Sequence, residues 1–246
     1  MENPEQELTS LVRALREYFQ AMQVSGISWF PAIPISNSPS VIPPDTALPT
    51  ASQTDRSAHG LLELGHSLEN CTRCRLANGR KTVVFGDGDP HAEIMFVGEG
   101  PGHEEDLQGL PFVGPAGQLL TRMIEAMGLT RQSVYICNIV KCRPPQNRDP
   151  SPDEIASCEE FIKQQIQLIS PRIIITLGNV AAKTLLQTTL GITRLRGNFH
   201  AYDSIPVMPT FHPSYLLRNP ESKRAAWNDL KMVMNEIDRM GLRRSK

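Results

Sequence analysis

Four of the five cysteines are spaced so that they could bind a metal centre. Cys71 and Cys74 form a C-x-x-C pair, and Cys142 and Cys158 follow after 67 and 15 intervening residues. Four thiolates can bind a zinc ion or an iron–sulfur cluster, and the spacing alone does not choose between them. The fifth cysteine, Cys137, alternates into an apolar segment and is predicted to be a buried core thiol. The cysteines therefore predict one structural thiolate centre.

A glycine-rich turn, Gly98-Glu-Gly-Pro-Gly, is the second candidate for chemistry. Its backbone amides can approach a ligand closely because glycine has no side chain. The turn matches neither the dinucleotide fingerprint nor the phosphate-binding P-loop. Glu99 lies inside it, and the acidic run 104–106 follows, so carboxylates could orient a water molecule or stabilise a developing cation. The alternative of an ordinary tight turn stays open at this point.

An aromatic and a histidine side chain lie in two further loops. Phe112, in Leu-Pro-Phe-Val-Gly, could form the floor of a base-sized pocket, although a core phenylalanine is the commoner explanation. His212 follows an apolar run, where an imidazole could donate a hydrogen bond to a leaving group or serve only as a structural residue. The segment 213–218 combines apolar and basic side chains, a composition that can wedge into a duplex while an arginine holds phosphate.

These candidates follow short apolar runs that alternate with helical patterns, and we expect the runs to form strands. The runs are 94–97, 134–139, 173–177 and 207–210. Helices are predicted over 116–127, from a capping box at Ser151 with proline next, over 181–186, and over 220–239 with Asn219 as the cap. The alternation predicts a three-layer α/β/α fold around a central, mainly parallel, four-stranded sheet. Such sheets bind ligands beyond the carboxyl ends of their strands, so the candidates should meet at one edge.

The first part of the chain has a different composition. Residues 1–57 are predicted to be a flexible N-terminal extension, and residues 58–246 the folded domain. Apolar residues at helical spacing predict a short amphipathic helix within 8–22, and prolines interrupt the stretch 25–56, which is typical of a disordered linker. Trp29 and Phe30 could bind an unidentified protein or only contact the surface of the domain.

Composition limits the class of protein. A chain of 246 residues, 40% hydrophobic, can bury one substantial core and carry an appendage. We expect no membrane association, because no signal-type apolar run or stretch of about 18 apolar residues occurs. The net charge is −1, and 25 − 3 = 22 basic residues face 26 − 6 = 20 acidic ones beyond residue 60. Affinity for phosphates must therefore come from local clusters such as Lys141, Arg143 and Arg148, or Arg194 and Arg196.

Four segments together resemble the family 4 uracil-DNA glycosylases, over about residues 61–240. They are Gly98-Glu-Gly-Pro-Gly-x-x-Glu-Asp, Pro111-Phe-Val-Gly-x-Ala-Gly-Gln-Leu-Leu, Asn138-Ile-Val-Lys-Cys-Arg-Pro-Pro and His212-Pro-Ser-Tyr-Leu-Leu-Arg. The resemblance implies a base excision repair enzyme that flips uracil out of single- or double-stranded DNA and hydrolyses its glycosidic bond. It also implies that Cys71, Cys74, Cys142 and Cys158 bind a [4Fe-4S] cluster. We expect a cytoplasmic, nucleoid-associated monomer.

The resemblance also implies roles for individual side chains. Phe112 would stack on the flipped uracil, and Asn138 would hydrogen-bond its polar edge, since an amide offers both a donor and an acceptor. His212 would stabilise the negative charge on the departing base, and Glu99 would lie beside the sugar and the attacking water. Gly100 and Glu105 are expected in the same substrate site. The expected DNA contacts are Lys141, Arg143, Leu216, Leu217 and Arg218.

Two other hypotheses stay open. The first is a uracil-DNA binder that traps its site covalently through a histidine in an inserted basic loop. The corresponding segment here, 143–150, is short and has no histidine, which argues against trapping. The second is a zinc–thiolate nucleotide-binding module without catalysis, in which metal analysis would find zinc and no sulfide.

Overall fold

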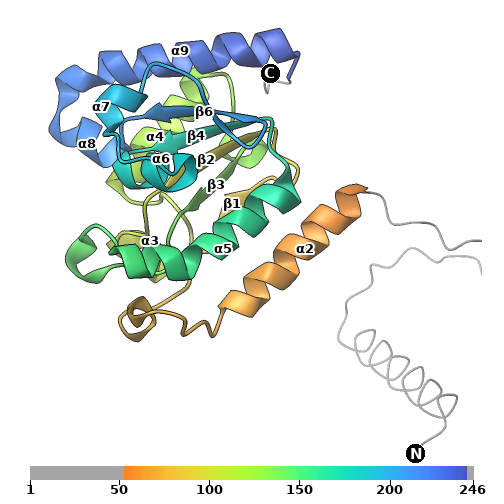
Figure 1. Ribbon diagram of the computed structural model, residues 1–246, viewed down its shortest axis with the longest axis vertical. Coiled ribbons are helices and arrows are strands. Elements are labelled where there is room, and N and C mark those ends of the chain that lie inside the picture. Colours follow the sequence, from red (N-terminus) through yellow and green to blue (C-terminus); the bar gives the residue numbers. More distant parts are fainter. Residues whose placement is uncertain (1–52, 243–246) are drawn as a thin grey trace, which may run out of the picture. The chain divides into compact units, whose positions relative to one another are not determined.

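The computed structural model of the protein describes residues 53–242 (Figure 1). The predicted amphipathic helix and most of the predicted linker lie outside the described residues. The first described element, helix α2 (Gln53–Leu68), includes the predicted domain start at Ala58. Within residues 53–242 no helix is long and apolar enough to cross a membrane.

Six strands form one mixed sheet in the order β1-β3-β2-β4-β6-β5 (Figure 1). The four central strands are parallel to one another and confirm the four predicted runs. They are β2 (Ile94–Gly98), β3 (Tyr135–Asn138), β4 (Ile173–Leu177) and β6 (Ile205–Thr210). Two short antiparallel strands, β1 (Asp87–Gly88) and β5 (His200–Tyr202), extend the edges. Neither was predicted, because segments of this length carry no hydrophobic period.

Helices cover both faces of the sheet, which confirms the predicted three layers. The longer helices are α2, α4 (Pro115–Ala126), α5 (Pro152–Ile169), α6 (Asn179–Leu186) and α9 (Lys223–Met240). The shorter ones are α3 (His103–Gln108), α7 (Ile192–Leu195), α8 (Pro213–Arg218) and the 3₁₀ turns η1 (Arg75–Asn78), η2 (Arg131–Ser133), η3 (Pro145–Asn147) and η4 (Pro220–Ser222).

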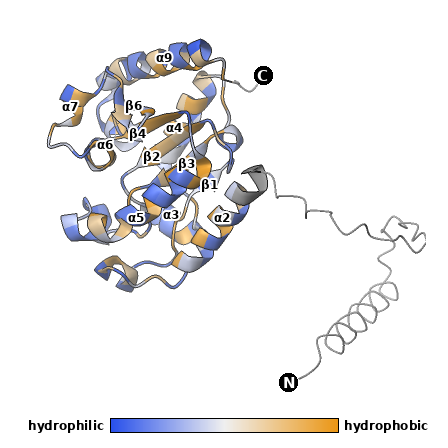
Figure 2. Ribbon diagram, turned by 45° about the vertical axis from the view of Figure 1, so that its right-hand side comes forward, coloured by the Kyte–Doolittle hydropathy of each residue, from blue (hydrophilic) through white to orange (hydrophobic). Residues whose placement is uncertain are grey.

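Each central strand is buried on both faces, and successive side chains enter opposite cores. Met95 packs in the core beneath α2, α5 and α6, whereas Phe96 packs in the core beneath α4 and α9. Figure 2 shows the strands as hydrophobic and the helices as two-sided. Helix α2 lies close to α5, because a Cβ at Gly60 would come within 2.6 Å of Leu168 Cδ2.

The helix starts were predicted with mixed success. Helix α5 begins at the predicted capping box, with Pro152 in its first turn. The predicted helix over 220–239 is instead the turn η4 followed by α9. Asn219 does not cap it through its side chain, since Asn219 Nδ2 donates to the Tyr215 carbonyl at 3.1 Å.

A buried acid on α9 fixes the end of β6. Asp229 is fully buried, and its carboxylate accepts hydrogen bonds from Arg196 Nη2 at 2.7 Å and from Thr210 Oγ1 at 2.7 Å. The Arg196 guanidinium also lies 5.2 Å from the ring centre of Phe211. Arg196 is therefore committed to the fold, which corrects its assignment to a phosphate-binding cluster.

Replacing Asp229 with alanine should lower the free energy of unfolding by about 3 kcal/mol, because Arg196 would lose its partner in a site that is largely dry. Urea unfolding followed by circular dichroism measures the change. The matched control is Lys231→Ala, an exposed position on the same helix, which should stay within about 0.5 kcal/mol of the unsubstituted protein. A loss for Asp229→Ala no larger than that of the control would contradict the structural role of the acid.

Candidate active site

The loops that follow the parallel strands surround one open cleft with a volume of about 820 Å³. They follow Gly98, Asn138, Leu177 and Thr210, the last residues of the parallel strands, which reach the same edge of the sheet. The structure therefore brings together most of the residues that the sequence singled out. Those that line the cleft are Glu99, Gly100, Glu105, Phe112, Asn138, His212, Leu217 and Arg218.

Gly98 lets two side chains meet at the cleft floor. A Cβ at this position would lie 2.4 Å from Asn138 Oδ1 and 2.5 Å from Phe112 Cζ, so any larger residue would push them away. Asn138 is the register partner of Gly98 on β3 and is only 1% exposed. Its Oδ1 has no hydrogen-bond partner in the part of the chain that the structure describes. Because a buried unpaired polar atom costs about 1–3 kcal/mol, this oxygen is poised to accept a hydrogen bond from a ligand.

Phe112 is held in a backbone conformation that bulky residues rarely adopt. Its φ is 54°, in the left-handed region. Arg131 fixes this turn, because its guanidinium donates to the carbonyls of Phe112 at 3.1 Å and Pro111 at 2.8 Å. Gly117 supports it from α4, where a Cβ would lie 1.9 Å from the Phe112 carbonyl oxygen. Arg131 was not singled out from the sequence, because the carbonyls that it binds lie 19 and 20 residues away along the chain.

Glu105 joins the two loops beside this floor. Its Oε1 accepts hydrogen bonds from the amides of Val113 and Gly114, each at 2.9 Å, and its Oε2 accepts one from the Gly102 amide at 3.1 Å. The carboxylate, predicted for the substrate site, is thus occupied by loop amides although the residue lines the cleft.

His212 is a neutral hydrogen-bond donor. The Ser214 amide lies 3.2 Å from His212 Nδ1 and donates to it, which assigns the ring proton to Nε2 and leaves that hydrogen available to a ligand. Burial lowers the pKa of His212 to about 4, and the nearby charge of Arg218 acts in the same direction. The ring lies 5.7 Å from that of Phe112, measured between centroids. Ser214 was missed, although its position two residues after His212 is typical of a capping turn.

Glu99 ionises close to neutral pH. Burial, together with the charge of Asp149 on another loop of the cleft, raises the pKa of its carboxyl to about 7. A carboxyl group with such a pKa can exchange a proton with a water molecule near neutral pH. Asp149 lines the same cleft and carried no expectation from the sequence.

Two predicted DNA contacts are wrong, because the side chains are buried. Lys141 is 1% exposed, and its ammonium donates to the Asn138 carbonyl at 2.7 Å and to Gln165 Oε1. It therefore supports the strand that carries Asn138 and cannot reach a phosphate. Leu216 is also 1% exposed and packs against Phe211, whereas Leu217 on the next position of α8 is 41% exposed.

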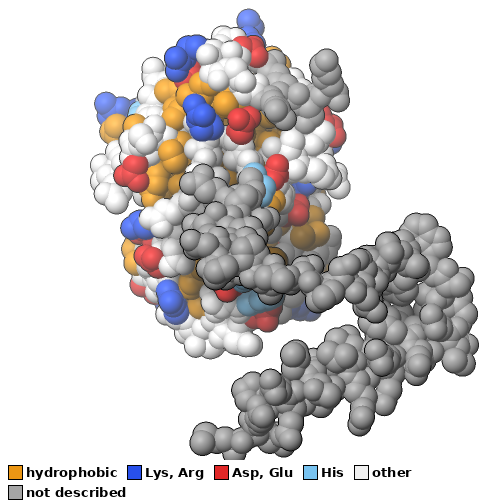
Figure 3. Space-filling model, turned by 90° about the vertical axis from the view of Figure 1, so that its right-hand side faces the viewer, with side chains coloured by type: hydrophobic (Ala, Val, Ile, Leu, Met, Phe, Trp, Pro, Cys, Tyr) orange, Lys and Arg blue, Asp and Glu red, His pale blue; other side chains and the backbone are white. Residues whose placement is uncertain are grey.

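The other predicted DNA contacts are accessible. Arg218 is exposed at the cleft, and Arg143 contacts His103 Nδ1 at 2.9 Å and Asn147 Oδ1 at 2.7 Å. Figure 3 shows a face of the molecule on which acidic and basic side chains are scattered among hydrophobic ones. On that face the charges do not gather by sign, in keeping with the expectation that phosphate contacts are local.

The four predicted metal-binding cysteines line one small cavity apart from the cleft. All are free thiols, and they come from the segment after α2 (Cys71 and Cys74), the loop after β3 (Cys142) and helix α5 (Cys158). Arg80 Nη1 donates to Cys142 Sγ at 3.4 Å. No three His, Cys, Asp or Glu side chains among residues 53–242 form a site for a single metal ion. Cys137 is fully buried in the core, as predicted.

Comparison with known proteins agrees with this geometry. A sequence model of the uracil DNA glycosylase superfamily matches residues 85–231. A type-4 uracil-DNA glycosylase of Thermotoga maritima is 46% identical over 178 residues, which cover 71% of this chain and 93% of the relative. One from Saccharolobus solfataricus is 44% identical over 183 residues, covering 71% and 85%. A type-5 uracil-DNA glycosylase of Pyrobaculum aerophilum is 30% identical over 183 residues, covering 61% and 80%. The chain therefore belongs to the uracil-DNA glycosylase superfamily and, within it, to family 4, the type-4 enzymes.

Proposed function

We propose that this protein is a DNA repair enzyme that excises uracil from DNA by hydrolysis and leaves an abasic site. The observation that carries the proposal is the buried, unpaired Oδ1 of Asn138 beside the ring of Phe112. A pyrimidine stacked on Phe112 would supply the missing donor from its N3–H, while the Asn138 amide donates to its O4. Cytosine has an acceptor at N3 and a donor at C4, so it does not match this amide.

The reaction begins with extrusion of the base, at a cost of a few kcal/mol for unstacking and unpairing. The bond between the sugar C1′ and uracil N1 then breaks, and its electron pair leaves with the base as an anion. His212 donates its Nε2 hydrogen toward that anion, and such a fixed donor is worth about 3–4 kcal/mol in a site that excludes water. A neutral imidazole keeps this hydrogen throughout the step.

Water completes the hydrolysis at the sugar. Its oxygen bonds to C1′, and the proton that it releases passes to the carboxylate of Glu99. The same carboxylate stabilises the positive charge that develops on the sugar while the base leaves. The uracil anion finally takes a proton from solvent and Glu99 releases its own proton to solvent, which balances the reaction and restores the carboxylate. The amide of Gly100 lies next to Glu99 in the same turn and is assigned to this end of the substrate.

Contacts with single- or double-stranded DNA are assigned to Arg143, Leu217 and Arg218. Leu217 is exposed at the cleft edge and can fill space left by the extruded base, while the arginines bind phosphates. Tyr215 joins this group, since it is 36% exposed and lines the same edge.

Cys71, Cys74, Cys142 and Cys158 are assigned to a [4Fe-4S] cluster. The fit rests on four free thiols that line one cavity and on Arg80, whose positive charge lies against Cys142 Sγ. The bound cluster supplies a cross-link between three segments of the chain, and the reaction itself is left to the cleft.

Residues 1–57 are assigned to an extension that docks another protein and takes no part in excision by a monomeric domain. The support for the second point is that, among the residues that the structure describes, all those lining the cleft lie downstream of this segment.

Replacing His212 with alanine should lower the single-turnover rate of uracil release by about 10²–10³-fold, because the departing anion loses its donor. The assay uses single- and double-stranded oligonucleotides that contain one uracil. Lys231→Ala, remote from the cleft, is the control and should release uracil at the unsubstituted rate. The proposed function is wrong if the unsubstituted protein releases no uracil from either substrate.

The rate of excision should rise with pH through about 7. The pKa of Glu99 is raised to about 7, so the carboxylate needed for the reaction forms as the pH passes that value. His212, with a pKa of about 4, stays neutral across this range, so its titration does not change the rate between these pH values. Single-turnover rates measured between about pH 5.5 and 8.5 test this, and Glu99→Gln should give a low, flat profile. A flat profile for the unsubstituted protein would rule out this role of Glu99.

Replacing Cys74 with alanine should abolish the broad visible absorption of the purified protein and lower its iron and sulfide content, since one cluster ligand is lost. Cys137→Ala is the matched control, because Cys137 is a core thiol and should leave absorption and iron unchanged. Zinc without sulfide in the unsubstituted protein would overturn the assignment of an iron–sulfur cluster.

A further inference from the structure

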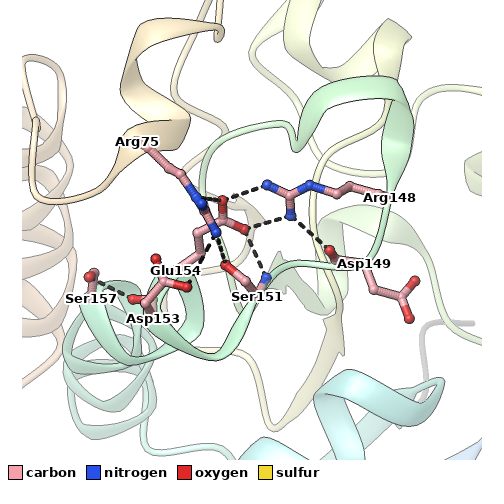
Figure 4. Close-up of polar contacts among 7 residues, drawn as sticks. All are labelled: Arg75, Arg148, Asp149, Ser151, Asp153, Glu154 and Ser157. Atoms are coloured by element: carbon pink, nitrogen blue, oxygen red, sulfur yellow. Dashed lines mark hydrogen bonds and ion pairs between the residues drawn. The ribbon is translucent and has the colours of Figure 1, made fainter.

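Glu154 is a fully buried carboxylate that does not line the cleft yet binds a residue that does. Arg148 donates to both of its oxygens, through Nη1 to Oε2 at 2.8 Å and through Nη2 to Oε1 at 2.7 Å (Figure 4). Arg75 Nε donates to Oε1 at 2.8 Å, and the Ser151 amide donates to Oε2 at 2.8 Å. These donors hold the pKa of Glu154 well below its usual range. The acid is therefore a fixed negative charge at the start of α5.

Arg148 belongs to a loop with little other anchoring. Residues 145–149, between β3 and α5, are exposed, and Gln146 and Asn147 have φ values of 56° and 54°. The loop bends back through short-range bonds, such as Arg148 N to the Pro145 carbonyl at 3.2 Å. A bidentate pair between arginine and carboxylate fixes both distance and orientation, which exposed backbone turns do not. The pair with Glu154 is thus the main link between this loop and the core.

Asp149 is placed by the same pair. Arg148 Nη1 also donates to the Asp149 carbonyl at 2.9 Å, so the guanidinium that binds Glu154 holds the next residue as well (Figure 4). Asp149 lines the cleft together with Glu99, and its charge is the one that acts on Glu99 in addition to burial. The other charged or titratable groups that line the cleft are His103, Glu104, Glu105, Arg148, His212, Tyr215 and Arg218.

We propose that Glu154 is a positioning residue for the reaction, which holds the Arg148–Asp149 wall of the cleft against Glu99. The inference rests on the proposed function, because it assigns Glu154 a part in the excision of uracil. Glu154 touches neither the base nor the sugar. Glu154 holds Arg148, and Arg148 fixes the position of Asp149. The charge of Asp149 then affects the pH at which Glu99 ionises.

The test is a cycle of single-turnover pH profiles for Glu154→Gln, Asp149→Asn, the double variant and the unsubstituted protein. In Glu154→Gln the rise of the single-turnover rate with pH, here called the limb, should move to lower pH by about half a unit. The reason is that Asp149, no longer held in place, opposes the ionisation of Glu99 less strongly. It should also lower the plateau rate about tenfold, as the cleft wall is no longer fixed. Asp149→Asn should shift the limb in the same direction.

The double variant decides the mechanism. If Glu154 acts through Asp149, Glu154→Gln causes no further shift of the limb in the Asp149→Asn background. Equal shifts in both backgrounds, or no shift in either, would overturn the proposal, and so would a loss of thermal stability with an unchanged limb. Arg239→Gln, which breaks an exposed pair with Glu236, is the control for loss of an arginine–glutamate contact and should leave the profile unchanged.

A second pair of measurements does not depend on catalysis. Amide hydrogen exchange over residues 143–150 should be faster in Glu154→Gln than in the unsubstituted protein, and unchanged exchange would contradict the proposal. If Glu154→Gln does not fold, Arg148→Lys replaces it, since lysine keeps the charge but not the bidentate geometry. The two proposals can fail separately. If the unsubstituted protein releases no uracil but exchange is faster in the variant, the proposed function is wrong, while the role of Glu154 in anchoring the loop is supported.

Discussion

The site depends on the absence of a side chain at Gly98. This residue ends the central strand β2, which lies between β3 and β4. A side chain at this position would therefore be surrounded by backbone and by the first residues of the neighbouring loops. Because Gly98 adds no Cβ, the Asn138 amide and the Phe112 ring can occupy the same small region. The remaining features of the floor follow from that contact. Phe112 must bend into a left-handed backbone conformation to reach it, and Arg131 and Gly117 stabilise the bend.

Burial acts in opposite directions on the two titratable groups of the cleft. It disfavours the charged form of each, so it lowers the pKa of His212 and raises that of Glu99. The result is an uncharged donor on one side and a carboxyl that ionises near neutrality on the other. The proposed excision uses that combination for a departing uracil anion and a developing sugar cation, and the partial burial of both groups in the cleft produces it.

Three buried carboxylates, Glu105, Glu154 and Asp229, join loops and helices around the site. Glu105 binds loop amides beside Phe112, Glu154 binds two arginines beside Asp149, and Asp229 binds Arg196 and Thr210 at the end of β6. Each acid is desolvated, and each recovers that cost through directional hydrogen bonds to groups that would otherwise be free to move. Glu105 and Glu154 also cap the helices on which they lie. Arg75, next to Cys74 in the chain, links the segment of that cysteine to Glu154.

The sequence by itself determined the central strands, the α5 cap, the buried Cys137 and the cleft residues Glu99, Phe112, Asn138 and His212. The strands, the cap and Cys137 depend on hydrophobic period and turn chemistry, and Glu99, Phe112 and His212 stood out as polar or aromatic residues in loops after strands. Asn138 was named only through the resemblance of its segment to the family 4 motifs. Only the tertiary structure decided which way a polar or apolar side chain points once its strand or helix has ended. Lys141 turns inward to Gln165, and Leu216 faces the core while Leu217 faces the cleft. The roles of Arg131, Asp149 and Glu154 were likewise hidden, because their partners lie on elements that pack together only in the folded chain.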